Sequence, residues 1–439
     1  MTTGLEGIAT KARQEKRLRF TSLAHHITRE KLWENLKKIP SNTSAGVDAQ
    51  DVAASKEKFA LWSEEMLNAL YRRGYKPAPA RRVYIPKPGS TQKRPIAVPT
   101  VSDRALQKTV TDILNAIYEE DFLNCSFGGR PKRSAHHAVA TLERIISAKK
   151  INWVFEADLR NFFGSLNQDW VKRFLSERVG DPRIMSLIHR WLRAGVMEEG
   201  QHQVMEQGTA QGGPISVLIS NIYLHYALDL WVEKVVRPKL KGEMYYIRYL
   251  DDFVLCFEYH ADAVKFRDVL EKRLNKFALE LEPSKTRLIE FGRLARRAAD
   301  KKGTRTETFS FLGFTFYDSK NRHGRYKVGM KTERKRLHRS CVKIKAMLRR
   351  YRHDPIREQK KRINVMLSGH NRYYGMPGNS KSLDNFYHVT LRYWREMLSS
   401  RSQNGKLNWD KYNRILKLFP LCQPRLHVTY TELSRLVML

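Results

Sequence analysis

The spacing of apolar residues changes along the chain and divides it into helical and strand-forming stretches. Between residues 151 and 317, short alternating runs are interspersed with runs at helical spacing, which predicts a mixed body of α/β or α+β type. Within this body, residues 151–158 (INWVFEAD) predict one strand and residues 217–235 predict a helix. Residues 245–257 (YYIRYLDDFVLCF) predict a strand, a tight acidic turn and a second strand.

The flanking stretches have equally local signatures. Residues 5–39 are charged and carry apolar residues at helical spacing, so they predict helices. The prolines of residues 76–100 exclude a long helix and predict a hairpin with cations at its tip. In residues 309–317 (FSFLGFTFY) the aromatic alternation changes phase at Gly313, which predicts a bulged strand, and the polar residues 292–307 predict an exposed loop.

A strongly basic helical stretch follows the mixed body. Residues 320–362 contain 18 lysines and arginines but three acidic residues. Apolar residues recur there at spacings of four, three, four and three, which predicts one packed helix face made of Leu337, Cys341, Ile344, Leu348 and Tyr351. The other faces carry cations, which either contact a polyanion or are solvated.

The overall charge favours a polyanionic partner. The 439 residues include 81 lysines and arginines against 45 acidic residues, a formal net charge of +36. Such an excess favours nucleic acid, although composition alone also fits a generally basic surface. We expect no membrane segment, because no run approaches about 18 consecutive apolar residues. The four scattered cysteines are expected to be reduced and structural.

Two adjacent carboxylates, Asp251 and Asp252, carry the clearest chemical signal. They stand in the predicted turn between apolar strands, where burying like charges is costly unless a cation is bound. Asp158, at the end of the strand 151–158, is the candidate third carboxylate. Three carboxylates can hold two magnesium ions for a phosphoryl-transfer reaction. An aspartate pair in a turn is, by itself, equally typical of a solvated turn, so the neighbouring motifs decide.

Those motifs resemble, in order, the conserved blocks of reverse transcriptases encoded by bacterial group II introns. The matching segments are SNTSAGVD, YIPKPGSTQKRPIAVPTVSDRALQ, SFGGRPKRSAHHA, FEADLRNFFGSL, QGTAQGGPISVLISNIYL, IRYLDDFVL, EPSKTRLIEF and FSFLGFTF. Beyond them, LSGHNRYYG and residues 383–412 look like the maturase or thumb region of the same family. Freestanding group II-like reverse transcriptases are similar as well.

The resemblance implies an α+β right-hand polymerase followed by an α-helical thumb. Its expected parts are an N-terminal extension (1–40), fingers and palm (41–318), a maturase-like thumb (319–400) and a small basic nucleic-acid-binding region (401–439). It also implies an RNA template, a DNA primer, deoxynucleoside triphosphates and two Mg²⁺ ions, which Mn²⁺ can replace. Structured intron RNA is a further expected partner, and the bacterial cytoplasm, close to the nucleoid, is the expected location.

The resemblance also implies roles for individual residues at the reaction centre. Asp158, Asp251 and Asp252 would be catalytic metal ligands, with the backbone carbonyl of Leu159 as an additional ligand. Tyr249 and Leu250 would lie close to the primer end.

A second set would bind the nucleotide. Arg94 and Lys87 would hold the triphosphate, with Lys93 an alternative for the lysine. Gln211 and Gly212 would contact the nucleotide. Phe163 would be the aromatic gate that excludes a 2′-hydroxyl, unless it is an ordinary core residue.

Further residues have predicted roles away from the nucleotide. Lys335, Arg336, Arg339 and Lys343 would contact the template–primer duplex, and Lys285 would support the carboxylates electrostatically or simply be solvated.

Three positions depart from the family pattern. Leu250 stands where alanine is usual, Ala210 where proline is usual, and Gly129 where phenylalanine is usual. No catalytic group is lost. The leading hypothesis is therefore an RNA-directed DNA polymerase, freestanding and with a host role in DNA repair or defence. The alternatives are an intron-encoded enzyme for splicing and retrohoming, and an RNA-binding maturase without polymerase activity.

Overall fold

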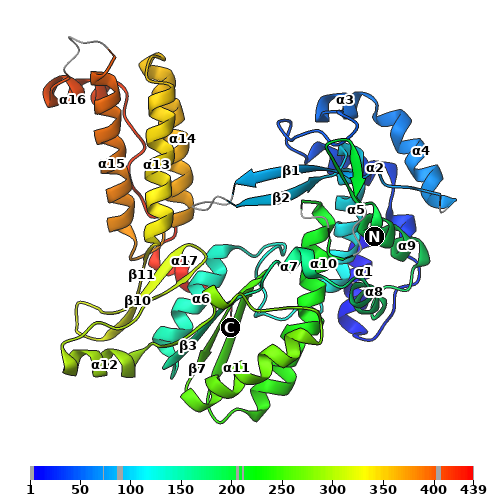
Figure 1. Cartoon of the computed structure of the whole chain (residues 1–439), viewed down its shortest axis with the longest axis horizontal. Helices are drawn as coiled ribbons and strands as arrows, with labels where there is room; N and C mark the ends of the chain where they lie inside the picture. The colour runs from blue at the N-terminus through cyan, green and yellow to red at the C-terminus, as the bar shows by residue number, and fades with distance from the viewer. Residues whose placement is uncertain are drawn as a thin grey trace.

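The computed structural model describes residues 4–72, 74–86, 92–203, 207–209, 212–401 and 407–438. Figure 1 shows an N-terminal helical part, a central body of strands and helices, and an upright group of C-terminal helices. The mixed α and β content agrees with the sequence prediction.

The N-terminal part is helical, as predicted. Thr28, Asp51 and Thr100 each cap a helix by accepting a hydrogen bond from a backbone N–H three residues later. The last helix of this part is almost wholly buried and anchors the others. The helices are α1 (Gly4–Gln14), η1 (Ala24–His26), α2 (Arg29–Lys37), α3 (Val52–Glu57), α4 (Phe59–Tyr71) and α5 (Val101–Tyr118).

The proline-rich segment forms the predicted hairpin. Strands β1 (Ala80–Pro86) and β2 (Lys93–Val98) pair antiparallel, while β1 pairs in parallel with β4 (Val196–Glu198), which in turn pairs with β5 (Gln201–Gln203). The tip of the hairpin, residues 87–91, lies outside the described residues.

The central sheet is antiparallel, with strand order β6-β7-β3-β8. Its strands are β3 (Trp153–Asp158), β6 (Met244–Tyr249), β7 (Asp252–Phe257) and β8 (Arg287–Glu290), and the two predicted strand segments are confirmed. Successive side chains of a strand point to opposite faces of the sheet, and here both faces are buried. Val154 and Val254 pack into one apolar cluster, and Phe155 and Phe253 pack into another. Helix α6 (Ala135–Ala148) covers the first face and α11 (His260–Asn275) the second.

A long helix crosses the body beside this sheet. It extends the predicted helix and consists of α10 (Pro214–Leu224), the π-helical turns η2 (His225–Asp229) and η3 (Val232–Val236), and η4 (Arg237–Lys239). This helix has the length and composition of a membrane span, but 78% of its apolar window is buried inside the fold, as in a core helix. Three shorter helices lie between β3 and this long helix in the sequence: α7 (Phe162–Ser165), α8 (Gln168–Ser176) and α9 (Pro182–Arg193).

Two local predictions are wrong. Instead of a bulged strand, β9 (Phe309–Phe311) and β10 (Phe314–Lys320) form a hairpin, because Leu312 and Gly313 both adopt positive φ and make a two-residue turn. Instead of an exposed loop, Arg293–Lys302 forms helix α12, which buries Ala295 and Ala299 and ends at the left-handed Gly303. The β9–β10 hairpin extends to β11 (Tyr326–Thr332), and η5 (Pro283–Lys285) precedes β8.

The C-terminal helices have their own apolar cluster. Ile344 and Leu348 of α13 (Arg334–Arg350) are buried in it and Leu337 and Cys341 pack against it, so the predicted packed face is confirmed at these four positions, whereas Tyr351 contacts Arg362. The other helices are α14 (Ile356–Tyr374), α15 (Ser380–Ser399), α16 (Trp409–Leu418) and α17 (Tyr430–Arg435). Residues 407–438 divide between two cores, since Tyr412 of α16 joins this cluster and Leu433 of α17 packs near α6.

Candidate active site

The three predicted carboxylates meet at one edge of the central sheet. Asp158 ends β3 and stands directly opposite Asp252, the first residue of β7. Asp251 lies beside them in the turn between β6 and β7. Register between strands thus brings together side chains that are almost one hundred residues apart in the sequence.

The turn that carries two of these acids has an unusual backbone. Tyr249 pairs with Asp252, so Leu250 and Asp251 form the two-residue connection, and Leu250 adopts φ of 57°. A positive φ is uncommon for a branched side chain and costs on the order of 1 kcal/mol. Contacts from surrounding segments must therefore hold the turn in this form.

Like charges dominate the electrostatics of the site. Desolvation, and then the charge of Asp158, raises the pKa of Asp251. Desolvation, followed by the charges of Asp158 and Asp251 and a hydrogen bond with Asp158, raises the pKa of Asp252 well above its ordinary range. Asp252 is exposed to solvent at the start of β7, which weakens the effect of desolvation on its pKa. Repulsion between the acids is therefore the main cause of the raised pKa.

A lysine provides the local counter-charge. The Lys285 ammonium donates a hydrogen bond to Oδ2 of Asp158. Desolvation opposes protonation of Lys285, but the hydrogen bond to Asp158 and the charges of all three acids raise its pKa overall. The predicted supporting contact of Lys285 therefore exists in the structure.

The donor set suits a divalent cation with hard oxygen ligands. Carboxylate oxygens are the ligands that Mg²⁺ prefers, and a cation would relieve the repulsion that raises both pKa values. Within the described residues, no three Asp, Glu, His or Cys side chains are already grouped as a metal site. Asp158 instead contacts Lys285 and Asp252. Leu159, whose carbonyl is the expected additional ligand, forms an isolated antiparallel β-bridge with Leu281.

Only part of the predicted nucleotide-binding set can be placed. Arg94 is exposed on β2, and its charge lies close enough to lower the pKa of Asp251. Lys93 is its exposed neighbour, whereas Lys87 and Gln211, together with Ala210, lie outside the described residues. Gly212 has φ of 135°, and a Cβ there would lie 2.4 Å from the carbonyl oxygen of Ala97, so this glycine permits contact with β2.

Phe163 lies in α7, on the segment that follows Asp158. The side chain is half-buried, and its ring packs edge-on against buried Phe162 with a centroid distance of 5.5 Å. Its carbonyl accepts a hydrogen bond of 2.9 Å from the backbone N–H of Thr209. Phe163 is thus attached to the short segment 207–209.

Two of the family departures contact each other. Leu250 is half-buried over the Gly128–Gly129 segment, and a Cβ on Gly129 would lie 3.3 Å from its Cδ2 atom and 2.3 Å from Cγ1 of Val217. A Cβ on Gly128 would lie 2.7 Å from the Leu250 backbone nitrogen. Glycine at both positions therefore makes room for leucine in the turn.

The four predicted duplex-binding cations lie on α13. Lys335, Arg336 and Lys343 are exposed, and Arg339 is half-buried. They span about 100° of the helix circumference, so they share one side of it. Arg336 also pairs with Glu333 at 3.6 Å.

Sequence reasoning did not single out Arg248 and Asp229, although this fully buried ion pair lies beside the Leu250–Asp251 turn. A signal was present, because Arg248 is a charged residue at an inward position of an otherwise apolar strand. Its partner, in contrast, could not be inferred from spacing.

An antiparallel sheet with paired acids at a hairpin turn, flanked by a fingers-like hairpin, defines the class of nucleic-acid polymerases. Residues 85–316, more than half of the chain, match the family described as reverse transcriptase (RNA-dependent DNA polymerase). The chain therefore belongs to the reverse transcriptase family, and it is an RNA-directed DNA polymerase of the group II type. Enzymes of this family use divalent metal ions.

Three curated relatives illustrate the similarity. Protein YkfC of Escherichia coli is 28% identical over 378 residues, which cover 78% of this chain and 94% of that protein. The group II intron-encoded protein LtrA of Lactococcus lactis is 33% identical over 219 residues, which cover 48% of this chain but 35% of LtrA. A 91 kDa protein in the cob intron of Schizosaccharomyces pombe is 33% identical over 172 residues, covering 39% of this chain and 21% of that protein.

Proposed function

We propose that this reverse transcriptase extends a primer 3′-hydroxyl by two-metal nucleotidyl transfer at Asp158, Asp251 and Asp252. The observation that carries the proposal is the strand register, which sets Asp158 opposite Asp252 with Asp251 alongside. Three mutually repelling carboxylates, two with raised pKa values, are arranged to accept cations.

Each group at the site has a defined task. Two bound Mg²⁺ ions, or Mn²⁺ in their place, would lower the pKa of the primer hydroxyl and neutralise charge on the triphosphate. The three acids hold these ions, and the carbonyl of Leu159 is an additional ligand. Lys285 supplies positive charge beside Asp158 and so helps to keep the local charge balanced. Tyr249 and Leu250 lie beside the primer end, and pyrophosphate is the leaving group.

The incoming nucleotide is held from the fingers side. Arg94 offers a planar guanidinium suited to bidentate phosphate contacts, and either Lys87 or Lys93 supplies a second cation. Gln211 and Gly212 are the proposed further contacts to the nucleotide. Phe163 itself closes the space beneath the sugar.

Primer extension provides the direct test of this assignment. The purified protein is expected to extend a DNA primer annealed to an RNA template when Mg²⁺ and deoxynucleotides are supplied, with Mn²⁺ also supporting activity. Binding of structured RNA without extension under either metal would instead favour the maturase without polymerase activity.

The sugar gate leads to a specificity prediction. Phe163→Val should raise the use of ribonucleotides relative to deoxyribonucleotides by about 10- to 100-fold, because the smaller side chain leaves room for a 2′-hydroxyl. Single-nucleotide incorporation with the two nucleotide types measures the ratio. Phe162→Val is the matched control, since it removes buried ring area and lowers the melting temperature without changing the ratio. An unchanged ratio for Phe163→Val would return Phe163 to the core.

Leu250 has a predicted role in seating the primer end. Its branched side chain fills space that alanine leaves open, so Leu250→Ala should lower the use of primers with few paired 3′ nucleotides while extension of long primers holds or rises. The side chain is half-buried, so the loss of stability should be below the roughly 2–5 kcal/mol of a fully buried leucine.

The competing explanation for Leu250 is packing alone. In that case extension from both primers would fall together with the melting temperature. Leu312→Ala is a suitable control, because Leu312 is also a half-buried leucine with positive φ in a two-residue hairpin turn. This control should leave the preference between short and long primers unchanged.

The biological role proposed is that of a freestanding bacterial enzyme, acting close to the nucleoid in DNA repair or defence. The contact between Leu250 and Gly129, which joins two departures from the intron-encoded pattern, supports this reading. The alternative is an intron-encoded protein for splicing and retrohoming, which the similarity to intron proteins supports. The flanking DNA discriminates, since an intron domain V beside the reading frame favours mobility and its absence favours a freestanding enzyme.

A further inference from the structure

A buried arginine lies directly behind the catalytic turn. Arg248 is the fifth residue of β6, and both it and its ion-pair partner Asp229 have side chains that are 0% exposed. Removing two charges from water is expensive, and such a pair is often no more stabilising than apolar side chains of the same size. The pair therefore calls for an explanation other than stability.

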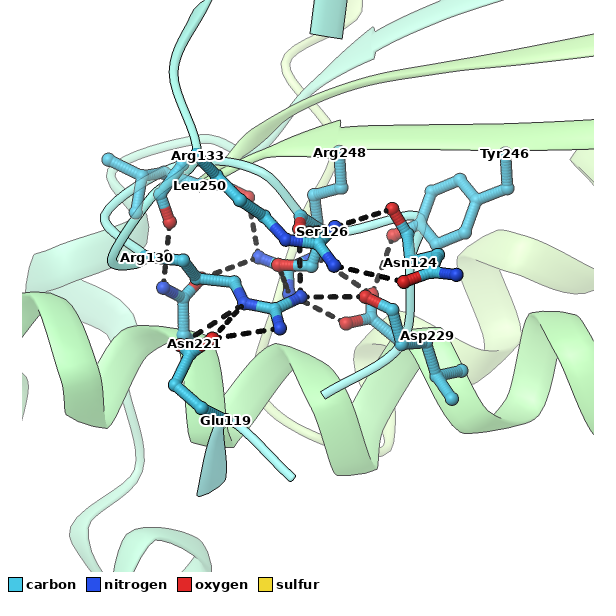
Figure 2. Close-up of polar contacts among 12 residues, drawn as sticks. Glu119, Asn124, Ser126, Arg130, Arg133, Asn221, Asp229, Tyr246, Arg248 and Leu250 are labelled. Atoms are coloured by element: carbon cyan, nitrogen blue, oxygen red, sulfur yellow. Dashed lines mark hydrogen bonds and ion pairs between the residues drawn. The ribbon is translucent and has the colours of Figure 1, made fainter. Parts of the chain in front are cut away.

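All five N–H donors of the Arg248 guanidinium are used, and Figure 2 shows its partners arranged around it. Two donors form a bidentate pair with Asp229, at 2.8 and 2.6 Å. The other three donate to Oδ1 of Asn221 (3.0 Å), Oγ of Ser126 (2.9 Å) and the carbonyl oxygen of Leu250 (3.2 Å). The last acceptor belongs to the strained residue of the turn itself.

These partners join two separate segments to the turn. The backbone of Arg248 accepts from Phe127 and donates to Cys125, so β6 is also held by the loop before α6. Asn221, which accepts from Arg248 through Oδ1, donates from Nδ2 to the carbonyl of Gly128, the glycine on which Leu250 rests. One side chain thus connects the long helix, the Gly128–Gly129 segment and the catalytic hairpin.

The π-helical turn accounts for the geometry of this network. Asn221 and Asp229 are eight residues apart and would point about 80° apart on a regular α-helix. The turn His225–Asp229 adds one residue to the helical repeat, which reduces this angle to about 20°. Both side chains therefore face the same guanidinium.

We propose that Arg248 is a positioning residue for catalysis, held by Asp229 and Asn221, which keeps the Leu250–Asp251 turn in its left-handed form. It acts through the carbonyl of Leu250 and so sets where the carboxylates of Asp251 and Asp252 lie. The proposal rests on the assignment of these acids as the catalytic ones.

The test replaces the network with apolar side chains. The triple variant Arg248→Met, Asp229→Leu, Tyr246→Phe removes the ion pair together with the Tyr246 hydroxyl, which donates to Asp229 at 2.9 Å. No unpaired charge remains, so the loss of melting temperature should be limited to that caused by two acceptors, Asn221 Oδ1 and Ser126 Oγ, that lose their donor. The turn loses its anchor, so kcat should fall by on the order of 10²-fold, with a smaller change in KM for the nucleotide.

A neighbouring ion pair provides the matched control. Arg130 and Glu119 pair at 2.9 Å, and Arg130 also donates to the carbonyls of Leu123 and Ser126 but not to the turn. The double variant Arg130→Met, Glu119→Leu removes a neighbouring, less buried pair between the loop before α6 and the end of α5 (Figure 2) and should keep kcat within a few-fold of the wild type.

Hydrogen exchange gives a readout that does not depend on activity. Amides in a peptide spanning residues 246–254 should exchange faster in the triple variant, but not in the control, while the remainder of the central sheet is unchanged. Faster exchange would support the anchoring of the turn even if Asp251 and Asp252 had another role, which keeps this proposal separable from the proposed function.

The proposal would be overturned by a stable triple variant with wild-type kcat and exchange, or by an equal loss in the control. Should the triple variant fail to fold, Arg248→Lys decides, because lysine keeps the charge opposite Asp229 but cannot also reach the Leu250 carbonyl. Retained kcat in that variant would contradict the proposal, and a loss like that described above would support it.

Discussion

Primer extension is expected to fall by on the order of 10³-fold when Asp251 is replaced by asparagine, without a loss of melting temperature. The amide cannot supply the negative charge that a divalent cation requires at this site. The side chain keeps its size and can still hydrogen-bond, so the turn should retain its shape. Extension on an RNA template with Mg²⁺, together with thermal melting, measures both effects.

The stability half of this prediction follows from the direction of the pKa shift. Desolvation and Asp158 raise the pKa of Asp251 above its ordinary value of 3.8. The folded state thus binds this proton more tightly than the unfolded state, and the free energy of unfolding decreases as the pH rises from about 3.8 through the raised pKa. Asparagine carries no such cost, so at neutral pH the metal-free variant should melt at or above the wild-type temperature.

A second carboxylate on the same sheet provides the control. Glu156 lies two residues before Asp158 on β3, has a pKa raised by desolvation, and pairs with Arg287 rather than with the acid cluster. Glu156→Gln should leave extension close to wild type. Near-normal extension by the Asp251 variant, or added Mg²⁺ stabilising it as much as the wild type, would show that Asp251 is not a metal ligand.

Neutralising the cations of α13 is expected to weaken template–primer binding by up to about 10³-fold at 0.1 M salt. Each phosphate contact contributes about 0.9 to the slope of log affinity against log salt on duplex DNA, so four contacts would contribute about 3.6. Arg336 shares its charge with Glu333, so a decrease of about 3 is expected when Lys335, Arg336, Arg339 and Lys343 are all replaced by glutamine. Binding measured across a salt series gives the slope directly.

A control variant with the same change in net charge distinguishes direct phosphate contacts from a general electrostatic effect. Four exposed cations on and after α12 serve this purpose: Arg297, Lys301, Lys302 and Arg305. Helix α12 lies on the opposite side of the β10–β11 hairpin from α13 (Figure 1), so their replacement should change the slope much less. Identical slopes for wild type and the α13 variant would mean that this helix face is only solvated.

Much of the local structure could be predicted because its causes are local. Alternating apolar residues make β3, β6 and β7 recognisable, and the spacing of Ile344 and Leu348 marks the packed side of α13. The two failures were the β9–β10 turn and helix α12. Neither the positive φ of Leu312 nor the burial of Ala295 and Ala299 can be read from residue types, since both depend on neighbouring segments.

The sequence by itself determined the order of elements, the three acids and the basic C-terminal helices. Residue types set hydrophobic period, charge and donor chemistry, and these properties do not depend on distant parts of the chain. The tertiary structure decided which of these groups meet. Strand register sets Asp158 opposite Asp252, and a π-helical turn aligns Asn221 and Asp229 on Arg248. Such contacts depend on how separate segments pack, and a buried charge meets its partner only when those segments pack together.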